Sequence, residues 1–484
     1  MRRRIKFFAL VALAGGLTFV HAAPSAADAT QVQRPRVVVL TDIEADPDDT
    51  QSLVRLFLYA NDIEIRGLVA TTSVHMKSGL HPESIRRVID RYARVLPRLR
   101  EHDRAYPEAS ALRALVTTGQ PTYGMQDFGE GHDTPGSTLL LRELDRADSR
   151  PLWVSVWGGA NTLAQALDTL RRTRSAQEVE RAVQRLRVYT ISDQDDTGAW
   201  LRREFPGLFY IVSPGGYGNA TWGGISQVVD GIDNSTISNE WFATHIQQGH
   251  GPLGAAYPDV AYGVEGDTPA FLGLIPNGLN VPDRPDWGGW GGRYERYIPR
   301  VEDTDPKGFN GGVPVEQETR PIWTNASDRF RPYVPASFGR AVKPGDKEYV
   351  GNGVTIWRWR QAVQNDFAAR MLWTTQPPSK ANHPPLVKLA QPSDMRVRGG
   401  DWVTLDATAS TDPDGDSLSF LWFPYPEAGT LKEPLKIGTE NLARVSFQVP
   451  KVEDAVTAHV VVQVSDKGKP ALTRYQRVIL HITP

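Results

Sequence analysis

The chain has 484 residues and a formal net charge of -2, and it contains no cysteine. This length leaves room for two or three domains. The near-balance of charges excludes the broad basic surface that attracts nucleic acids or anionic membranes. The lack of cysteine excludes disulfides, thiol chemistry and lipid attached to cysteine.

The first residues have the pattern of an export signal. Basic residues at Arg2–Arg4 and Lys6 precede the apolar run Phe7–Val20, and small residues follow. We therefore predict a signal peptide over residues 1–27. Because the apolar run is short for a membrane span, we expect a periplasmic or secreted protein without membrane contact after cleavage. An uncleaved anchor is the alternative.

An acidic turn follows. Val37–Leu40 is an apolar run that predicts a buried strand, and Leu53, Leu56 and Phe57 have helical spacing. Between them, Thr41–Asp49 carries five carboxylates. The acids are therefore expected in a βα turn at the carboxyl end of a strand, where open α/β sheets bind ligands.

Carboxylates packed this closely repel one another unless a cation is bound, and their hard oxygens suit Ca²⁺ or Mg²⁺. The alternative is an ordinary helix start, with Asp46 as cap and with Asp48 and Asp49 complementing the helix dipole. That alternative accounts for two or three of the acids.

The turn resembles the amino-terminal DxDPGxDD signature of nucleoside hydrolases, and more narrowly a secreted nucleoside-hydrolase-like family, partly labelled cellulose-binding, with an appended β-sandwich. Glu44 replaces the second aspartate of the signature, which leaves the identity of the base open. The resemblance implies one Ca²⁺ ion and an activated water that attacks a glycosyl bond. It implies that the catalytic candidates are Asp42, Asp46 and Glu44, and that the metal candidates here are Asp42, Asp48 and Asp49.

Strand and helix patterns then alternate up to about residue 213. The further apolar strand candidates are Ile65–Thr72, Leu115–Thr118, Leu152–Trp157, Arg187–Ile191 and Phe209–Ser213. Such alternation predicts an α/β domain over residues 34–373, with a mostly parallel sheet and helices on both faces.

Two predicted strand ends carry further candidates. Trp157 begins a segment that resembles the one from which nucleoside hydrolases give the metal a backbone carbonyl, and Asn161 is a substrate-binding candidate. A glycine-rich turn with Asn161 as helix cap is the alternative. Asp193 and Asp196 are placed to bind sugar hydroxyls or to supply an acid, unless their loop is merely solvated.

A late segment, residues 265–269, holds Asp267 where the resemblance implies the last metal ligand, with Glu265 as a substrate-binding candidate. Gly266 stands where that family has a histidine, so the acid for the leaving group is missing. A helix cap before Pro269 is the alternative role for Asp267.

Residues 214–340 are rich in glycine and aromatic residues, which is typical of functional loops. Flat aromatic faces suit sugar rings, and glycine permits close approach. We expect a sugar-binding wall from this region, and its candidate residues are Asn219, Trp222, Trp287, Trp290 and Arg293.

A proline-rich linker is predicted over residues 374–385, and short alternating strands beyond it predict an all-β sandwich over 386–484. The turn Ser410–Asp416 resembles that of bacterial PKD or Ig-like domains. Its alternating aspartates suit a tight turn or a Ca²⁺ site, but Phe423 at the twelfth position excludes an EF-hand.

Three functions fit these patterns. The first is an exported, Ca²⁺-dependent hydrolase that acts on a glycan or glycoside at an anomeric carbon. The second is a carbohydrate-binding (cellulose-binding) protein without turnover that uses the same pocket. The third, a phosphatase of the haloacid-dehalogenase type, needs an aspartate where Glu44 stands. The oligomeric state stays open.

Overall fold

The computed structural model describes residues 33–214, 220–304, 313, 315–336, 342–431, 433–438 and 441–484. The predicted signal peptide (residues 1–27) and Asn219 lie outside the described residues. Arg34–Pro484 form one compact unit. Within the described ranges, no helix combines the length and the apolar character that crossing a membrane requires.

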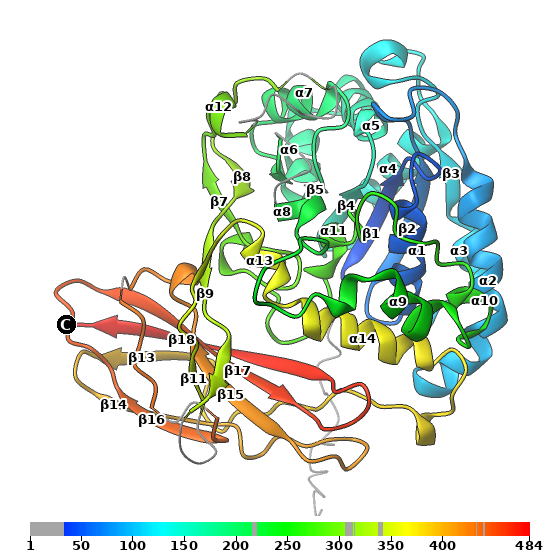
Figure 1. The fold of residues 1–484 in the computed structure, drawn as a ribbon. Coiled ribbons are helices and arrows are strands. Elements are labelled where there is room, and N and C mark those ends of the chain that lie inside the picture. Colours follow the sequence, from blue (N-terminus) through cyan, green and yellow to red (C-terminus); the bar gives the residue numbers. More distant parts are fainter. Residues whose placement is uncertain are drawn as a thin grey trace, which may run out of the picture. The chain divides into compact units, whose positions relative to one another are not determined.

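An eight-stranded sheet forms the centre of the first domain (Figure 1), with strand order β3-β2-β1-β4-β5-β6-β8-β7. All neighbours are parallel except β7 and β8, which are antiparallel. The strands are β1 (Arg36–Thr41), β2 (Glu64–Ala70), β3 (Val116–Thr118), β4 (Leu152–Val156), β5 (Leu186–Thr190), β6 (Phe209–Val212), β7 (Tyr294–Tyr297) and β8 (Ile322–Asn325).

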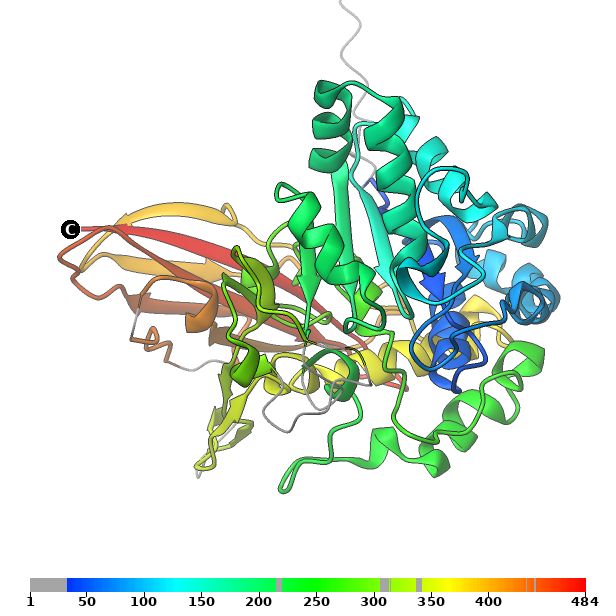
Figure 2. The same ribbon diagram turned by 90° about the horizontal axis from the view of Figure 1, so that it is seen from above.

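Helices cover both faces of this sheet (Figure 2). Val37 and Val39 of β1 join the core under α1, α2 and α14, whereas Val38 and Leu40 join the core under α4 to α7. The longer helices are α1 (Asp48–Leu58), α2 (Pro82–His102), α3 (Ala109–Ala114), α4 (Pro135–Asp145), α5 (Asn161–Thr173), α6 (Ala176–Arg185), α7 (Thr197–Glu204) and α14 (Arg360–Leu372). The prediction of a mostly parallel sheet with helices on both faces is confirmed.

Short elements make up the region between β6 and α14. Its helices are α8 (Ala220–Gly223), α9 (Asn239–Phe242), α10 (Gly251–Gly254), α11 (Pro269–Leu272), α12 (Val301–Thr304) and α13 (Val354–Trp357). Two small antiparallel sheets pair β9 (Asp328–Phe330) with β12 (Tyr349–Gly351) and β10 (Tyr333–Pro335) with β11 (Val342–Pro344).

The C-terminal strands form a four-stranded sheet, β13-β18-β17-β15, and a two-stranded sheet, β14-β16. Their inward residues share one hydrophobic core, as expected for a sandwich. The strands are β13 (Asp394–Arg398), β14 (Trp402–Asp406), β15 (Ser419–Pro424), β16 (Arg444–Gln448), β17 (Val456–Ser465) and β18 (Thr473–Thr483).

The central strands of the larger C-terminal sheet, β17 and β18, are largely buried on both faces. The outer face of this sheet, which we call the junction face, carries Phe423, Tyr425, Val461 and Tyr475, and these four residues belong to the core of the α/β domain. Buried ion pairs accompany this packing. Asp366 of α14, for example, accepts a hydrogen bond from Arg474 of β18 at 2.6 Å.

Candidate functional site

A cavity of about 550 Å³ opens at the carboxyl end of the central sheet. We call it the acidic cavity. The end of β1, the start of α1 and the loops after β2, β4 and β5 contribute to its wall. It is lined by Asp42, Ala45, Asp46, Asp48, Asp49, His75, Trp157, Gln194, Trp222, Tyr262 and Asp267. The predicted turn and the late Asp267 therefore meet, although they are far apart in sequence.

Four of the acids are buried: Asp42 is 3 % exposed, Asp48 6 %, and Asp49 and Asp267 2 % each. Burial raises the pKa of Asp42. Burial and then the neighbouring carboxylates hold the pKa of Asp48, Asp49 and Asp267 well above the usual value. Within the described residues, no arginine or lysine forms an ion pair with any of the four. The cavity thus gathers four buried carboxylates without an arginine or lysine partner in the described part of the chain.

Local contacts hold these acids in place. Thr41 donates its hydroxyl hydrogen bond to Asp49, and Trp222 Nε1 donates to Asp48 Oδ2 at 2.8 Å. Asp46 Oδ1 accepts from the backbone N–H of Asp48 at 2.9 Å, which ties Asp46 to the first residue of α1. Gly158 permits Asp42 to approach, because a Cβ there would lie 2.7 Å from Asp42 Cγ.

The oxygen set fits a hard divalent cation. Asp48, Asp49 and Asp267 can each offer an oxygen within 4.8 Å of the others. Oδ2 of Asp267 is buried without a hydrogen-bond partner. A buried carboxylate oxygen in that state is costly unless it ligates a cation. The carbonyl of Trp157 accepts a hydrogen bond from Gln194 Nε2 at 2.6 Å and keeps a second lone pair.

Gly266 has a specific steric role. A Cβ at this position would lie 2.0 Å from Cδ1 of Trp222 and 2.6 Å from Oδ2 of Asp48. The indole of Trp222 therefore occupies the space that a side chain at 266 would need. Trp222 thus lines the acidic cavity, as expected for a substrate-binding residue.

Glu44 points away from the acidic cavity. Its backbone has φ +89°, and its carboxylate accepts hydrogen bonds from Ser84 and from Arg87 at 2.7 Å. These groups line a separate groove of about 580 Å³ that also contains Arg91 and Arg94. The structure thus separates Glu44 from the other two catalytic candidates.

Four further candidates are engaged elsewhere. Asn161 Nδ2 donates to Thr72 Oγ1 and to the Thr122 carbonyl, both at 3.0 Å. Asp193 pairs with Arg202 at 2.8 Å, and the fully buried Glu265 pairs with Arg55. Asp196 accepts from the backbone N–H of Met125 at 3.1 Å. None of these four described residues lines the acidic cavity.

The glycine-flanked tryptophans also differ from expectation. Trp290 is fully buried and packs near Tyr475 of the junction face, with ring centroids 6.4 Å apart. Trp287 contacts His459, and Arg293 bonds to Asp328 at 2.6 Å. The expected sugar-binding wall of Trp287, Trp290 and Arg293 is therefore absent from the described wall of the acidic cavity.

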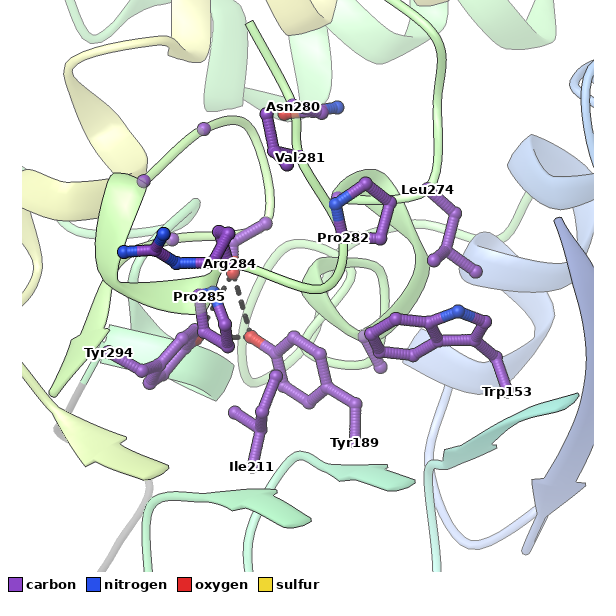
Figure 3. Close-up of a pocket in the computed structure, with 16 residues that line it drawn as sticks. Trp153, Tyr189, Ile211, Leu274, Asn280, Val281, Pro282, Arg284, Pro285 and Tyr294 are labelled. Carbon is purple, nitrogen blue, oxygen red and sulfur yellow. Dashed lines mark hydrogen bonds between the residues drawn. The ribbon is translucent and has the colours of Figure 1, made fainter. Parts of the chain in front are cut away.

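A small pocket lies next to this loop. Figure 3 shows Tyr189, Trp153 and Tyr294 around it, and the Tyr189 hydroxyl donates to the Gly291 carbonyl at 2.8 Å. Its volume of about 40 Å³ is far too small for a sugar ring. The glycine-rich loop here packs against the sheet rather than forming a binding surface.

Residues 36–294 match the family described as "Cellulose-binding Sde182, nucleoside hydrolase-like domain". The chain belongs to this family. Residues 402–482 match its C-terminal domain, "Cellulose-binding protein Sde0182, C-terminal domain". The resemblance to a nucleoside-hydrolase-like family with an appended C-terminal domain is thereby confirmed.

Solved structures agree with the family assignment. A nucleoside hydrolase-related hypothetical protein from Saccharophagus degradans is 33 % identical, with a TM-score of 0.76, and the match covers 93 % of this chain and all of that chain. The effector protein XOO4466 covers 60 % of this chain and 88 % of its own at 12 % identity, but its TM-score of 0.31 supports no argument. No curated protein matches the chain.

Besides Ala45, sequence reasoning missed three residues of the acidic cavity that carry polar groups: His75, Gln194 and Tyr262. A signal existed for two of them. His75 follows the end of β2, and Gln194 lies between the predicted Asp193 and Asp196, so both come directly after strands of the parallel sheet. Tyr262 lies in an irregular loop, where no periodic pattern points to it.

Proposed function

We propose that the protein is a Ca²⁺-dependent hydrolase that cleaves a carbohydrate or glycoside at an anomeric carbon and acts in the periplasm or outside the cell. The observation that supports this most strongly is the set of four buried carboxylates, without an arginine or lysine partner in the described chain, around a cavity of about 550 Å³. Such a cavity accepts a sugar ring and a cation together.

Asp48, Asp49 and Asp267 would hold the cation, with Asp42 and the Trp157 carbonyl beside them. Bound Ca²⁺ would hold sugar hydroxyls and lower the pKa of a water molecule. The residues themselves supply rigidity, since Thr41 and Trp222 fix the carboxylates of Asp49 and Asp48. Little reorganisation would then be needed on binding.

Asp42 is our choice for the base. It directly follows β1, so its backbone is fixed by the sheet, and it is held close to Gly158. Asp46 is the rival, but it is only partly buried and one of its oxygens accepts the backbone hydrogen bond of Asp48. A base takes a proton from water while the bond to the anomeric carbon forms.

His75 would act as the general acid that protonates the leaving group. The histidine of nucleoside hydrolases is replaced by Gly266, and His75 lies on the cavity wall in the loop after β2. A histidine placed there can donate that proton to the leaving group.

The substrate class is inferred from the relatives. The family is described as cellulose-binding, and the solved relative is described as associated with carbohydrate metabolism. A carbohydrate therefore fits better than a nucleoside, and the predicted export agrees with a glycan outside the cell.

A second candidate function is carbohydrate binding without turnover. It is favoured by the pair of Gly266 and Trp222, in which an indole occupies the place of a side chain able to donate a proton. An indole face suits a sugar ring in either case.

A product-release screen on the whole protein separates the two functions. Plant and algal polysaccharides would be incubated with Ca²⁺ or with chelator, using wild type, Asp42→Asn and Asp46→Asn. Hydrolysis predicts products that disappear with chelator and with Asp42→Asn. Binding to insoluble cellulose without products supports the second function, and neither binding nor products refutes both.

A further inference from the structure

Three oxygen atoms beside the C-terminal sandwich are buried without a hydrogen-bond partner: Oδ1 of Asn382, Oδ2 of Asp412 and Oδ2 of Asp466. Asn382 lies between α14 and the sandwich, Asp412 lies between β14 and β15, and Asp466 follows β17. Asn382 is 7 % exposed and Asp466 2 %. Buried acceptors in this state are rare in proteins and costly.

The other polar atom of each of these three side chains forms hydrogen bonds, and these bonds fix the orientation of the side chain. Asp466 Oδ1 accepts from the backbone N–H groups of Leu472 at 2.9 Å and Gly468 at 3.0 Å. Asp412 Oδ1 accepts from the backbone N–H groups of Asp414 at 2.9 Å and Asp416 at 3.0 Å. Rotation of either carboxylate would only exchange its two oxygens, so one oxygen of each stays without a hydrogen bond.

Further contacts bring the three residues together. Asn382 Nδ2 donates to Asp466 Oδ1 at 3.0 Å. Leu386 and Thr411 exchange two backbone hydrogen bonds, of 2.8 and 3.0 Å, which place the Asp412 loop beside the linker. Burial raises the pKa of Asp466, and the charge of Asp412 adds to the effect.

We propose that Asn382, Asp412 and Asp466 bind a Ca²⁺ ion. The donors are all oxygen, and two of them are carboxylates, which suits this hard cation. A single water molecule donates only two hydrogen bonds, so it would leave one of the three acceptors unpaired and two like charges unbalanced. No protein cation of the described chain takes this place, because the nearby His383 pairs with Asp414 instead.

The ion would tie together three segments of chain that are distant in sequence. Asn382 is anchored to the α/β domain, because Trp373 Nε1 donates to its carbonyl at 2.9 Å. The loops of Asp412 and Asp466 belong to the sandwich. The proposed ion therefore clamps the linker onto the sandwich, and it is separate from the cation proposed at the carboxyl end of the central sheet.

Two carboxylates and one amide make a weak site, so saturation is expected at about 0.1–1 mM Ca²⁺, the range of extracellular modules. The test is a Ca²⁺ titration of the whole protein, with bound ions counted by equilibrium dialysis and stability followed by thermal unfolding. Asp466→Asn should lose one bound Ca²⁺ per chain. Mg²⁺ at equal concentration should not replace it.

Asp466→Asn should nevertheless fold. The amide oxygen can accept the same backbone hydrogen bonds, and its NH₂ group would point toward the free oxygens of Asp412 and Asn382 in place of the ion. The metal-free melting temperature should therefore be equal to or higher than that of wild type. Asp412→Asn is the second variant, and it should lose the same ion.

Asp414→Asn is the matched control, because it removes the same charge from the same turn but affects an exposed carboxylate paired with His383. It should keep the full number of ions. Asp49→Asn removes the cation of the acidic cavity, so the two sites are counted independently. If both Asp466→Asn and Asp412→Asn bind as many Ca²⁺ ions as wild type, the proposal is overturned, whatever happens at the cavity.

Discussion

Two aspartates with the same burial, Asp366 and Asp267, have opposite surroundings. Each is 2 % exposed. Asp366 bonds to Arg370 at 3.0 Å and to Arg474 at 2.6 Å. Although burial opposes it, these arginines lower the pKa of Asp366. Asp267 forms no ion pair with a basic residue of the described chain, and burial and then the neighbouring carboxylates hold its pKa well above the usual value.

This difference in partners distinguishes a buried acid that stabilises the fold from a buried acid that binds a ligand. A buried acid with arginine partners is neutralised by the protein itself, so it holds two elements together and requires nothing else. A buried acid among other acids is unbalanced, and such groups concentrate where a ligand supplies the missing charge. The same contrast distinguishes Glu265, paired with Arg55, from Asp267 two residues later.

The largest loss of stability is expected when Asp366, the aspartate with arginine partners, is removed. Asp366→Ala removes the acid that Arg370 and Arg474 share. Arg474 then has no carboxylate partner among the described residues, while Arg370 keeps only Asp62, so the free energy of unfolding should fall by about 3–5 kcal/mol. Denaturant unfolding measures this. The control is Asp283→Ala, which breaks the exposed pair with Arg187 and should cost about 0–1 kcal/mol. Equal losses in the two variants would contradict the comparison.

The next largest effect is the stabilisation by Ca²⁺ expected at Asp48, Asp49 and Asp267, the clustered acids of the acidic cavity. In an Asp466→Asn background, Ca²⁺ at about 100 times its Kd should raise the free energy of unfolding by about 2.7 kcal/mol through the acidic cavity. Adding Asp49→Asn should abolish that rise, because one of the three clustered carboxylates loses its charge. A Ca²⁺-dependent shift that survives Asp49→Asn would rule out this ligand set.

The two aspartates should also respond oppositely to pH. The folded pKa of Asp48, Asp49 and Asp267 is raised, so without metal the protein should lose stability as pH rises above the unfolded value of about 3.9. Each pKa unit corresponds to about 1.4 kcal/mol. Asp366, with its lowered pKa, contributes stability above that pH and loses it below.

Thermal unfolding between pH 4 and 8 measures this, with chelator and with Ca²⁺. The decline toward neutral pH should appear with chelator, should be smaller with Ca²⁺, and should be smaller in Asp49→Asn without metal. Identical pH profiles for wild type and Asp49→Asn in chelator would show that the cluster is not the cause.

The smallest effect is expected at Glu44. Its carboxylate pairs with the exposed Arg87, outside the acidic cavity, so Glu44→Gln should change stability by about 0–1 kcal/mol. If the protein hydrolyses a glycan, turnover should stay within about two-fold of wild type. A loss of turnover as large as that of Asp42→Asn would show that Glu44 takes part in catalysis after all.

The sequence predicted the fold and the acidic turn because both depend on local patterns. The apolar run before Asp42 and the helical spacing after Asp49 fix where the acids lie. The side chains that pair with each acid were harder to predict, because they come from segments that are distant in sequence. Nothing local distinguishes Glu265, which binds Arg55, from Asp267, which binds no side chain through Oδ2.

The aromatic residues illustrate the same limit. Trp222, Trp287 and Trp290 all lie in glycine-rich stretches of the sequence, yet of these three only Trp222 lines the acidic cavity. Trp290 instead packs at the junction face, which a sequence pattern cannot reveal because it depends on the placement of the sandwich. His75 was missed because it stands in no recognisable triad or metal-ligand spacing, and its place after a strand of the parallel sheet was the one signal for it.

The junction face has a consequence for how the chain is made. Trp290 and Trp359 are synthesised before Phe423, Tyr425 and Tyr475, which cover them in the finished protein. At about 5–20 residues per second, the last hundred or so residues take on the order of 10 s to appear. During that interval the α/β domain has an uncovered aromatic surface, so we expect a nascent chain stopped near residue 373 to recruit a chaperone.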